Sequence, residues 1–351
     1  MVAIEKISLK NSDKLTFLGN LSTMITAGIP ILETIDSLLE DSKGNTKKVL
    51  EIIREDMVQG HHLYSSFAKF PNVFDKVTVN VVKASEEAGT LDVTLKDLRA
   101  QIQKEIEFND KVKAAMIYPA VIVVVFLGVL LLILTVVIPK ISAVFSRLNV
   151  NLPLPTRVLI FASHVLLDYT LPVIVGSIVI GTISYLIFKA QKKLILDFFY
   201  SLPLISDLVK EIDLARFSRS MFLLLTSGIT ITNALELAEE VVRRRDISAA
   251  IKYAKETVLG GKNLSQGFKE QKKVFSSIIV KIIEAGEKTG TLDKSMSDIS
   301  EQQDYRVTNS LKTLTTLLEP VMLVMVGILV GAVMLSIIAP IYGLIGQVSS
   351  K

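Results

Sequence analysis

Three long uncharged runs stand out in the pattern of hydrophobic and polar positions along the chain. Residues 114–139 carry no charged side chain, and a helix of this length crosses a bilayer core of about 30 Å at about 1.5 Å per residue. Residues 169–188 and 320–345 form two further uncharged runs that are apolar enough for the same role, and the third predicted helix, 319–345, starts at Glu319. The pattern therefore predicts three transmembrane helices.

The middle run is the weakest of the three. It follows Asp168 directly, and the apolar segment 158–167, "VLIFASHVLL", precedes it. Either the span begins before residue 169, or 158–167 forms a separate short helix in the membrane interface.

Lysine and arginine residues near the span ends predict the orientation, because these residues favour the cytoplasmic side. They precede the first and third spans and follow the second: Lys104, Lys111, Lys113, Lys189, Lys192, Lys193, Arg306 and Lys312. The connection 140–168 holds only three such residues. We therefore expect 1–113 and 189–318 in the cytoplasm, and 140–168 and the tail 346–351 outside.

Both soluble segments have the pattern of helices. In "LTFLGNLSTMITAG" (15–28), hydrophobic residues recur every three or four positions, which is typical of an amphipathic helix. Gly28 offers a C-terminal cap, and Gly228 repeats the same break. No run alternates between apolar and polar residues clearly enough to place a sheet. The sequence thus predicts an all-α membrane protein with two tandem cytoplasmic helical bundles and three transmembrane helices.

The two bundles are copies of one unit. The octet "SEEAGTLD" (85–92) returns as "GEKTGTLD" (286–293). A shift of 200 residues superimposes the region of Gly28, and a shift of 201 superimposes the chain from Gly60 onward, so one residue is inserted between them. The matched pairs include Phe17 and Phe217, Gly28 and Gly228, Phe67 and Phe268, Gly89 and Gly290, Pro119 and Pro320, and Pro139 and Pro340. The unit is one bundle followed by one span, and 169–188 is an unpaired span that returns the chain to the cytoplasm.

The repeated octet predicts a corner between two helices. Gly89 and Gly290 tolerate the left-handed conformation that ends a helix, and Thr90 and Thr291 follow as caps of the next helix. We predict that the repeated prolines also lie at structural corners; these are Pro119, Pro139, Pro320 and Pro340. An alternative is that the acidic residues of the octets bind a cation or a partner; these are Glu86, Asp92, Glu287 and Asp293.

The composition narrows the function. Half of the 351 residues are hydrophobic and the mean hydropathy is +0.48, more than in an ordinary soluble domain. With no Cys and three His, the chain is poorly supplied for disulfides, thiolate sites or metal catalysis. We predict no cofactor, no metal site and no enzymatic activity. The net charge of +4 is modest, and no motif supports nucleic-acid binding.

Charge differs between the two halves. Residues 1–113 hold 15 Lys and Arg against 17 Asp and Glu, whereas 189–318 hold 20 against 16. The basic half contains the run Arg243-Arg244-Arg245. This run is either an exposed, solvated helix face or a docking surface for an acidic partner or anionic lipid.

Other candidate motifs are weak. "LGGKNLS" (259–265) lacks the first glycine of a phosphate-binding loop and has Asn263 where a magnesium ligand belongs. His61 and His62 are neighbours on the chain, so we expect them at a solvated surface. No Asp, Glu, Lys, Arg or His interrupts the apolar runs, which argues against the chief rival class, a membrane transporter or channel component.

The third span contains Gly327 and Gly331, four residues apart. Small residues at this spacing allow close helix approach. They predict a contact either with a neighbouring span of the same chain or with a second copy of it.

The order of these motifs resembles one known family, the inner-membrane platform proteins of type IV pilus assembly and type II secretion, called PilC or GspF. The resemblance extends from about Lys14 to the end of the chain. It is carried by "FLGNLSTMITAGIPILETI", "KVKAAMIYPAVIVV", "LPLPTR", "FFYSLPLISDLVKEIDLARFSRSMFLLLTSGITITNALELA", "GEKTGTLD" and "LEPVMLVMVGILVG".

The resemblance implies a bacterial inner-membrane platform that couples a cytoplasmic secretion or pilus ATPase to pilin or pseudopilin subunits as they enter a fibre. It further implies contacts with other inner-membrane assembly proteins and with membrane lipids, and a homo-oligomer of two or more copies. The ATPase would then be the partner of the basic half, with Arg243, Arg244 and Arg245 as its docking surface.

Overall fold

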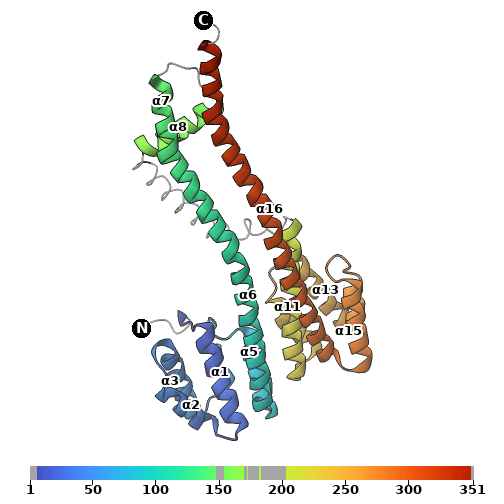
Figure 1. Ribbon diagram of the computed structural model, residues 1–351. Coiled ribbons are helices and arrows are strands. Elements are labelled where there is room, and N and C mark those ends of the chain that lie inside the picture. Colours follow the sequence, from blue (N-terminus) through green and yellow to red (C-terminus); the bar gives the residue numbers. More distant parts are fainter. Residues whose placement is uncertain (1–5, 148–153, 170–171, 173–181, 183–202, 349–351) are drawn as a thin grey trace. The chain divides into compact units, whose positions relative to one another are not determined.

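Every regular element that the structure describes is a helix. The computed structural model describes residues 6–147, 154–169, 172, 182 and 203–348 (Figure 1). The all-helical fold predicted from the sequence is confirmed for these residues.

The chain divides into two compact units. The bundle unit comprises Met1–Lys111 and Asp207–Asn309, and the span unit comprises Val112–Ser206 and Ser310–Lys351. The bundle unit contains both copies of the repeated bundle, so the two copies are parts of one compact body.

Six helices of the first copy recur in the same order in the second. The first copy consists of α1 (Asn11–Thr26), α2 (Ile31–Glu40), α3 (Gly44–Val58), α4 (Leu63–Ala68), α5 (Lys76–Ala88) and α6 (Leu91–Leu132). The second consists of α11 (Pro203–Thr226), α12 (Ile231–Glu239), α13 (Arg245–Leu259), α14 (Leu264–Lys269), α15 (Ser277–Thr289) and α16 (Leu292–Val348). The structure also locates the inserted residue. It lies in the loop between α12 and α13, because the flanking helices match at shifts of 200 and 201 residues.

Three buried phenylalanine rings form the centre of each bundle. In the first bundle, Phe17 of α1 lies 6.1 Å from the ring centres of both Phe67 and Phe74, which stack at 3.9 Å. The second bundle repeats the triad with centre distances of 5.9, 5.9 and 4.1 Å; its members are Phe217, Phe268 and Phe275. Aromatic rings at these distances bury much apolar area and attract one another, so the triad joins segments that are far apart in the chain.

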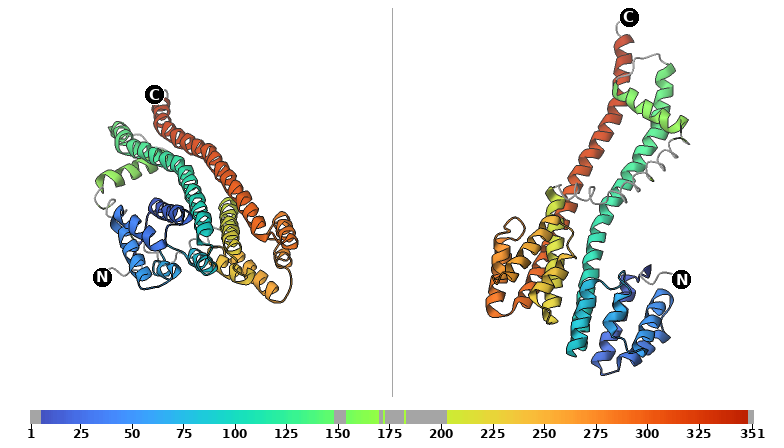
Figure 2. Two further views of the ribbon diagram at one scale, coloured as in Figure 1. Left: turned by 90° about the horizontal axis from the view of Figure 1, so that it is seen from below. Right: turned by 180° about the vertical axis from the view of Figure 1, so that it is seen from behind.

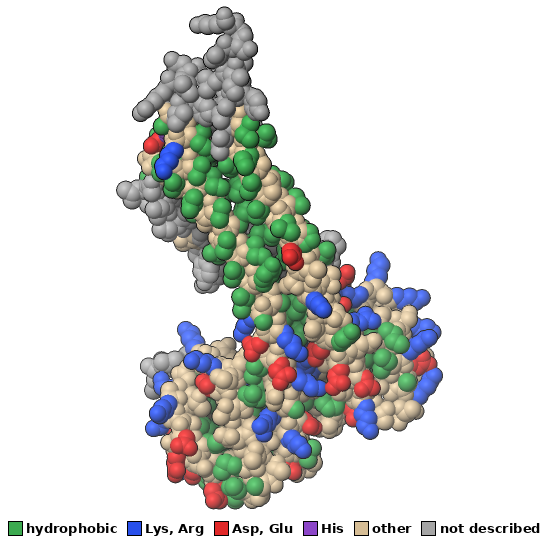
Figure 3. Space-filling view, viewed as in Figure 1, with side chains coloured by type: hydrophobic (Ala, Val, Ile, Leu, Met, Phe, Trp, Pro, Cys, Tyr) green, Lys and Arg blue, Asp and Glu red, His purple; other side chains and the backbone are tan. Residues whose placement is uncertain are grey.

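The last helix of each bundle continues without a break into an apolar stretch. Figure 2 shows α6 and α16 as continuous helices in both views. Leu95 and Leu98 of α6 are buried in the bundle core, whereas Val121 and Val124 of the same helix are exposed. Figure 3 shows hydrophobic side chains gathered along the apolar parts of both helices, and charged side chains over the bundles. The expected boundaries at 113 and 318 therefore fall inside helices.

The repeated prolines lie within helices rather than at corners, which corrects the sequence prediction. Pro119 is inside α6, Pro320 and Pro340 are inside α16, and Pro139 is the second residue of α7 (Ile138–Arg147). The reason is their surroundings. A chain that crosses an apolar medium must satisfy its backbone internally, so a proline there interrupts one hydrogen bond without ending the helix.

The connection 140–168 is largely helical. A π-helical turn, η2 (Ile133–Val137), joins α6 to α7, and α8 (Leu154–Asp168) packs against both η2 and α7. The buried Ser163 of α8 donates a hydrogen bond of 2.6 Å to the carbonyl of Leu134. A π-turn widens the helix and loosens its hydrogen-bond ladder, and the serine satisfies one carbonyl there. Residues 158–167 thus belong to a separate helix of 15 residues, one of the two alternatives expected for them.

Two helices among the described residues are long and apolar enough to cross a membrane. They are Leu91–Ala143, which contains the first predicted span, and Leu292–Leu335, which covers residues 319–335 of the third. The second predicted span, 169–188, lies outside the described residues except for three positions.

Gly286 marks a close approach between α15 and α16 in the second bundle. A methyl group at this position would overlap the hydroxyl of Ser295 and lie 2.8 Å from its Cβ. The first bundle has Ser85 there, which is fully buried and donates to the carbonyl of Val82. The two copies therefore pack the same corner with different pairs of side chains.

We expect Gly286→Ala to destabilise the chain by about 1–3 kcal/mol, because the added methyl overpacks the contact with Ser295. Thermal unfolding of the detergent-solubilised chain, followed by circular dichroism, measures the effect. Gly128→Ala is the matched control, since no described atom lies within 4 Å of a methyl group there. Equal melting of the two variants would contradict the close approach.

Candidate functional site

The repeated corners have the same backbone geometry in both copies. Gly89 and Gly290 end α5 and α15 with φ of 71° and 72°, the left-handed conformation that the sequence predicts. The next residue closes each corner, with N–H to carbonyl distances of 2.9 Å from Thr90 to Ser85 and from Thr291 to Gly286. Bonds of this kind satisfy carbonyls that a helix end leaves unpaired.

Gly28 and Gly228 end the first helix of each copy in the same way. Their φ angles are 84° and 79°, and each follows the last turn of its helix by two residues. A left-handed residue is needed at these positions, and glycine adopts it without steric strain.

The threonines of the corners do not cap with their side chains, contrary to expectation. Their carbonyl groups accept the first helical bonds, at 3.1 Å from Thr94 to Thr90 and from Ser295 to Thr291. The hydroxyl of Thr291 instead lies 2.7 Å from the hydroxyl of Thr289. These threonines thus start the following helix through the backbone alone.

The glutamates of the octets cap short helices elsewhere in the same bundle. The Glu86 carboxylate accepts from the backbone N–H groups of Leu63 and Tyr64, at 3.0 and 3.2 Å. Glu287 accepts from those of Leu264 and Ser265, at 2.6 and 3.2 Å. A negative carboxylate at the positive end of α4 or α14 is a stabilising arrangement. This structural role explains why both copies keep the glutamate.

The metal alternative gains no support from the geometry. Asp92 and Asp293 lie in the first turns of α6 and α16, where an acidic side chain complements the helix dipole. Among the residues that the structure describes, no group of His, Asp and Glu is placed to hold a metal ion. His62 stacks on Tyr64 and lies 3.2 Å from Glu86, and the imidazoles of both His61 and His62 are largely exposed.

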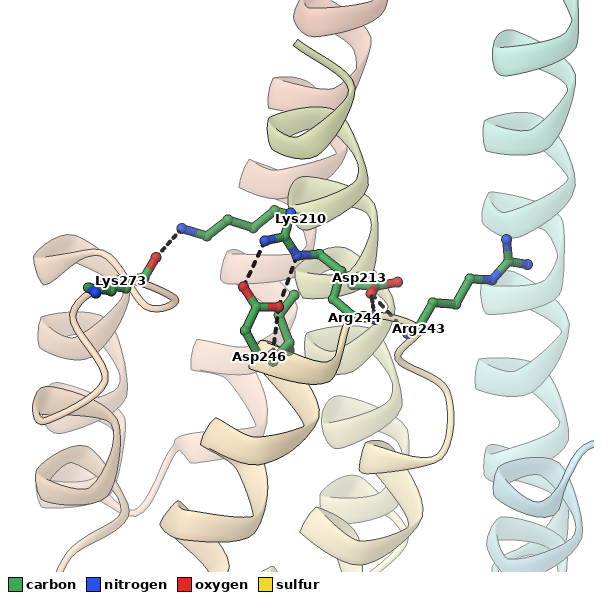
Figure 4. A network of polar contacts seen from close by, with 7 residues as sticks. Lys210, Asp213, Arg243, Arg244, Asp246 and Lys273 are labelled. Carbon is green, nitrogen blue, oxygen red and sulfur yellow. Dashed lines mark hydrogen bonds and ion pairs between the residues drawn. The ribbon is translucent and has the colours of Figure 1, made fainter. Parts of the chain in front are cut away.

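The arginine run lies in a loop rather than on a helix face. Arg243 and Arg244 belong to the loop between α12 and α13, and Arg245 is the first residue of α13. The backbone N–H groups of Arg243 and Arg244 donate to one carboxylate oxygen of Asp213 in α11, at 2.9 and 2.8 Å (Figure 4). These two hydrogen bonds give the loop a defined conformation. The arginines therefore do not form the solvated helix face that was one of the two alternatives.

Burial and pairing set the charges of this loop. Asp213 is fully buried, and burial raises the pKa of its carboxyl above the ordinary value, although the two N–H bonds partly offset the effect. The Arg244 guanidinium makes two hydrogen bonds to Asp246, at 2.9 and 2.7 Å, and these bonds lower the pKa of that carboxyl. Arg244 is thus held by its neighbour, whereas the side chains of Arg243 and Arg245 are exposed.

A further cation lies beneath the loop. Burial lowers the pKa of the Arg216 guanidinium, and the positive charge of Arg243 lowers it further. In the first copy the corresponding position is Thr16, and the α2–α3 loop is shorter. Arg216 and Arg245 therefore have no basic counterpart in the first bundle, whereas Arg244 corresponds to Lys43.

Gly327 and Gly331 of α16 do not contact another described helix. Gly327 is exposed, and no described atom lies within 4 Å of a methyl group built on Gly327 or Gly331. Their role in helix contact stays a prediction.

Comparison with known proteins gives one family. A family model described as "Type II secretion system (T2SS), protein F" matches the chain twice, at residues 17–139 and 217–340. The matches coincide with the two repeated units, from the triad phenylalanine of each first helix to the proline near the end of each apolar stretch.

Several characterised proteins are similar over nearly the whole chain. The type IV pilus assembly protein PilC of Myxococcus xanthus is 31% identical over 97% of this chain and 82% of its own length. PilC of Thermus thermophilus is 29% identical over 96% of this chain and 84% of its own length. The type II secretion system protein F of Vibrio cholerae is 26% identical over 96% of this chain and 83% of its own length.

Asp213→Ala should destabilise the second bundle by about 1–3 kcal/mol, because two N–H groups of the loop lose their acceptor. Asp213→Asn keeps an acceptor oxygen and removes a buried charge, so its stability should be close to that of the parent chain. The raised pKa means that the folded state disfavours the ionised carboxyl, so the parent loses stability as the pH rises through that pKa, and the Asn variant does not.

Thermal unfolding at several pH values and amide hydrogen exchange at Arg243 and Arg244 measure these effects. Equal stability and equal exchange in the Ala and Asn variants would show that the carboxylate does not hold the loop.

Proposed function

Because the chain belongs to the type II secretion system protein F family, we propose that it is the membrane platform of a machine that builds a pilus or a secretion fibre. The resemblance inferred from the sequence motifs is confirmed by the family match. Relatives named for pilus assembly and for type II secretion are both similar to the chain, and the family resemblance implies a fibre in either case.

The continuity of α6 and α16 carries this proposal. Each begins in the buried core of a bundle and ends in an exposed apolar stretch. With 42 and 57 residues, they are about 63 and 86 Å long at about 1.5 Å per residue. A bundle that is shifted by a partner would carry the apolar part of its own helix with it, because no loop separates the two.

The partners follow from this role. A cytoplasmic ATPase would supply the movement, and pilin or pseudopilin subunits, other inner-membrane assembly proteins and lipids would surround the apolar helices. The chain itself would perform no catalysis. A transporter is the less favoured function, because no Asp, Glu, Lys, Arg or His interrupts the apolar runs 114–138 and 320–345.

The arginine loop is our candidate for the ATPase contact. It has a defined backbone, and it exposes Arg243 and Arg245 near the half-buried Arg216. An acidic surface of the motor would complement this charge and would be steered toward it. Arg244 is half-buried and its guanidinium is bound by Asp246, so we assign the contact to its two exposed neighbours.

The topology can be tested with reporter fusions. Alkaline phosphatase fused after Arg147 should be active, because the Lys and Arg distribution predicts that this end of α7 lies outside the cytoplasm. The same enzyme fused after Lys255 of α13 should be inactive. The reverse pattern would exclude a cytoplasmic second bundle.

The docking surface can be tested by charge reversal. In a host that lacks its own copy of the gene, the parent chain should restore fibre assembly, and Arg243→Glu/Arg245→Glu should restore little of it. In detergent, the variant should bind the cognate ATPase more weakly, and its binding should depend less on salt.

Lys47→Glu/Lys48→Glu on α3 is the matched control, since both lysines are exposed and distant from the loop in sequence. Unchanged ATPase binding by the loop variant, or equal loss in the control, would place the motor contact elsewhere.

A further inference from the structure

The two bundles of one chain touch through unlike faces. Helix α5 of the first copy contacts α12 of the second, and Lys76 pairs with Glu240 at 2.8 Å. A groove along this contact is lined from one side by α5 and from the other by α12 and the turn before it. The residues that line it are Asn80, Lys83, Ala84, Glu87, Gly228, Ile229, Thr230, Asn233, Glu236 and Leu237.

The repeat means that each bundle carries both faces. Helix α15 of the second copy is the counterpart of α5, and α2 of the first copy is the counterpart of α12. The contact within the chain uses α5 and α12. The corresponding faces of α15 and α2 take no part in this contact.

Exposure distinguishes the used face from its counterpart. Val77 of α5 is 4% exposed, whereas the matching Ile278 of α15 is 46% exposed. On the same side of the helix, Ala84 is half-buried, and its counterpart Ala285 is exposed. In the part of the chain that the structure describes, this side of α15 is therefore uncovered, and a large hydrophobic side chain, Ile278, is exposed near the start of the helix.

Charge distinguishes them as well. The contact within the chain places Asn80 and Asn233 along one groove, but their counterparts are Lys281 on α15 and Glu33 on α2. The α15 face also carries Lys288, which pairs with Glu284 of the same helix at 2.5 Å, and the α2 face carries Glu40. The two asparagines of the internal contact are thus replaced by a lysine on the α15 face and a glutamate on the α2 face.

We propose that the α15 face of one chain binds the α2 face of a second copy, in the manner in which α5 binds α12 within a chain. The basic surplus of the second half and the acidic surplus of the first then serve one interface. Opposite charges on the two faces favour this pairing over contacts between like faces, which would place lysine against lysine or glutamate against glutamate.

This inference rests on the repeat and not on the ATPase contact. Its test can therefore be made in membranes of a host without any pilus or secretion machinery, where the ATPase and pilins are absent. A failure here would leave the proposed function untouched, and a failure of the ATPase contact would leave this interface untouched.

Cysteine crosslinking of the full chain is a direct test, because the parent sequence has no cysteine. The internal pair Lys76 and Glu240 corresponds to Ser277 and Glu40 across two chains. Ser277→Cys and Glu40→Cys, carried by two chains of different size in the same membrane, should be joined by a short bismaleimide into a mixed dimer. Lys76→Cys/Glu240→Cys in one chain is the positive control and should react internally.

Lys47→Cys of α3, in place of Glu40→Cys, gives the level of random collision. A mixed dimer no more abundant than with Lys47→Cys would overturn the proposal, including the case in which anionic lipid or another protein covers α15 instead.

Charge exchange provides the second measurement. Adding Lys281→Glu to the Ser277→Cys chain should lower the crosslinked fraction several-fold, because it faces Glu33 of the other copy. Adding Glu33→Lys to the Glu40→Cys chain should restore it. A crosslinked fraction that ignores both changes, or that is not restored by the second, would show that these faces do not meet.

Discussion

The packing of three phenylalanine rings is the interaction on which each bundle depends. The rings come from the first helix, from the six-residue helix α4 or α14, and from the turn before α5 or α15. A helix of six residues has almost no stability alone, so α4 and α14 exist only because a buried ring and a glutamate cap hold them. Without the triad, the capping glutamate would have no helix end to bind, and the corner that leads into the long helix would lose its support.

The two copies keep this centre and exchange the pairs around it. Ser85 and Thr94 fill the corner of the first bundle, whereas Gly286 and Ser295 fill that of the second, with a smaller residue on each side. Such paired substitutions preserve the packing of the core, whereas surface residues differ between the copies without this constraint. The difference is seen in the α12–α13 loop, which has one inserted residue: Arg244 corresponds to Lys43, whereas Arg245 corresponds to Gly44.

Local signals in the sequence predicted the helices, the repeat and the glycine corners, because each depends on residues within a few positions of one another. Contacts between distant residues were not predictable in this way. The bond from Glu86 to Leu63 spans 23 residues and that from Asp213 to Arg243 spans 30, so the roles of these acids required the folded chain. The prolines were misplaced for a different reason: in water they end helices, but in an apolar stretch the backbone has no other partner than its own helix.

The contact between α5 and α12 has a consequence for symmetry. It joins unlike faces, so a two-fold axis cannot relate the two sides. When a contact of this type is repeated from chain to chain, each copy is related to the next by the same rotation, and the result is a closed ring or an open helix. Both assemblies are directional: each chain presents one face to the neighbour before it and a different face to the neighbour after it. This direction follows from the unlike faces through which the two bundles of one chain meet.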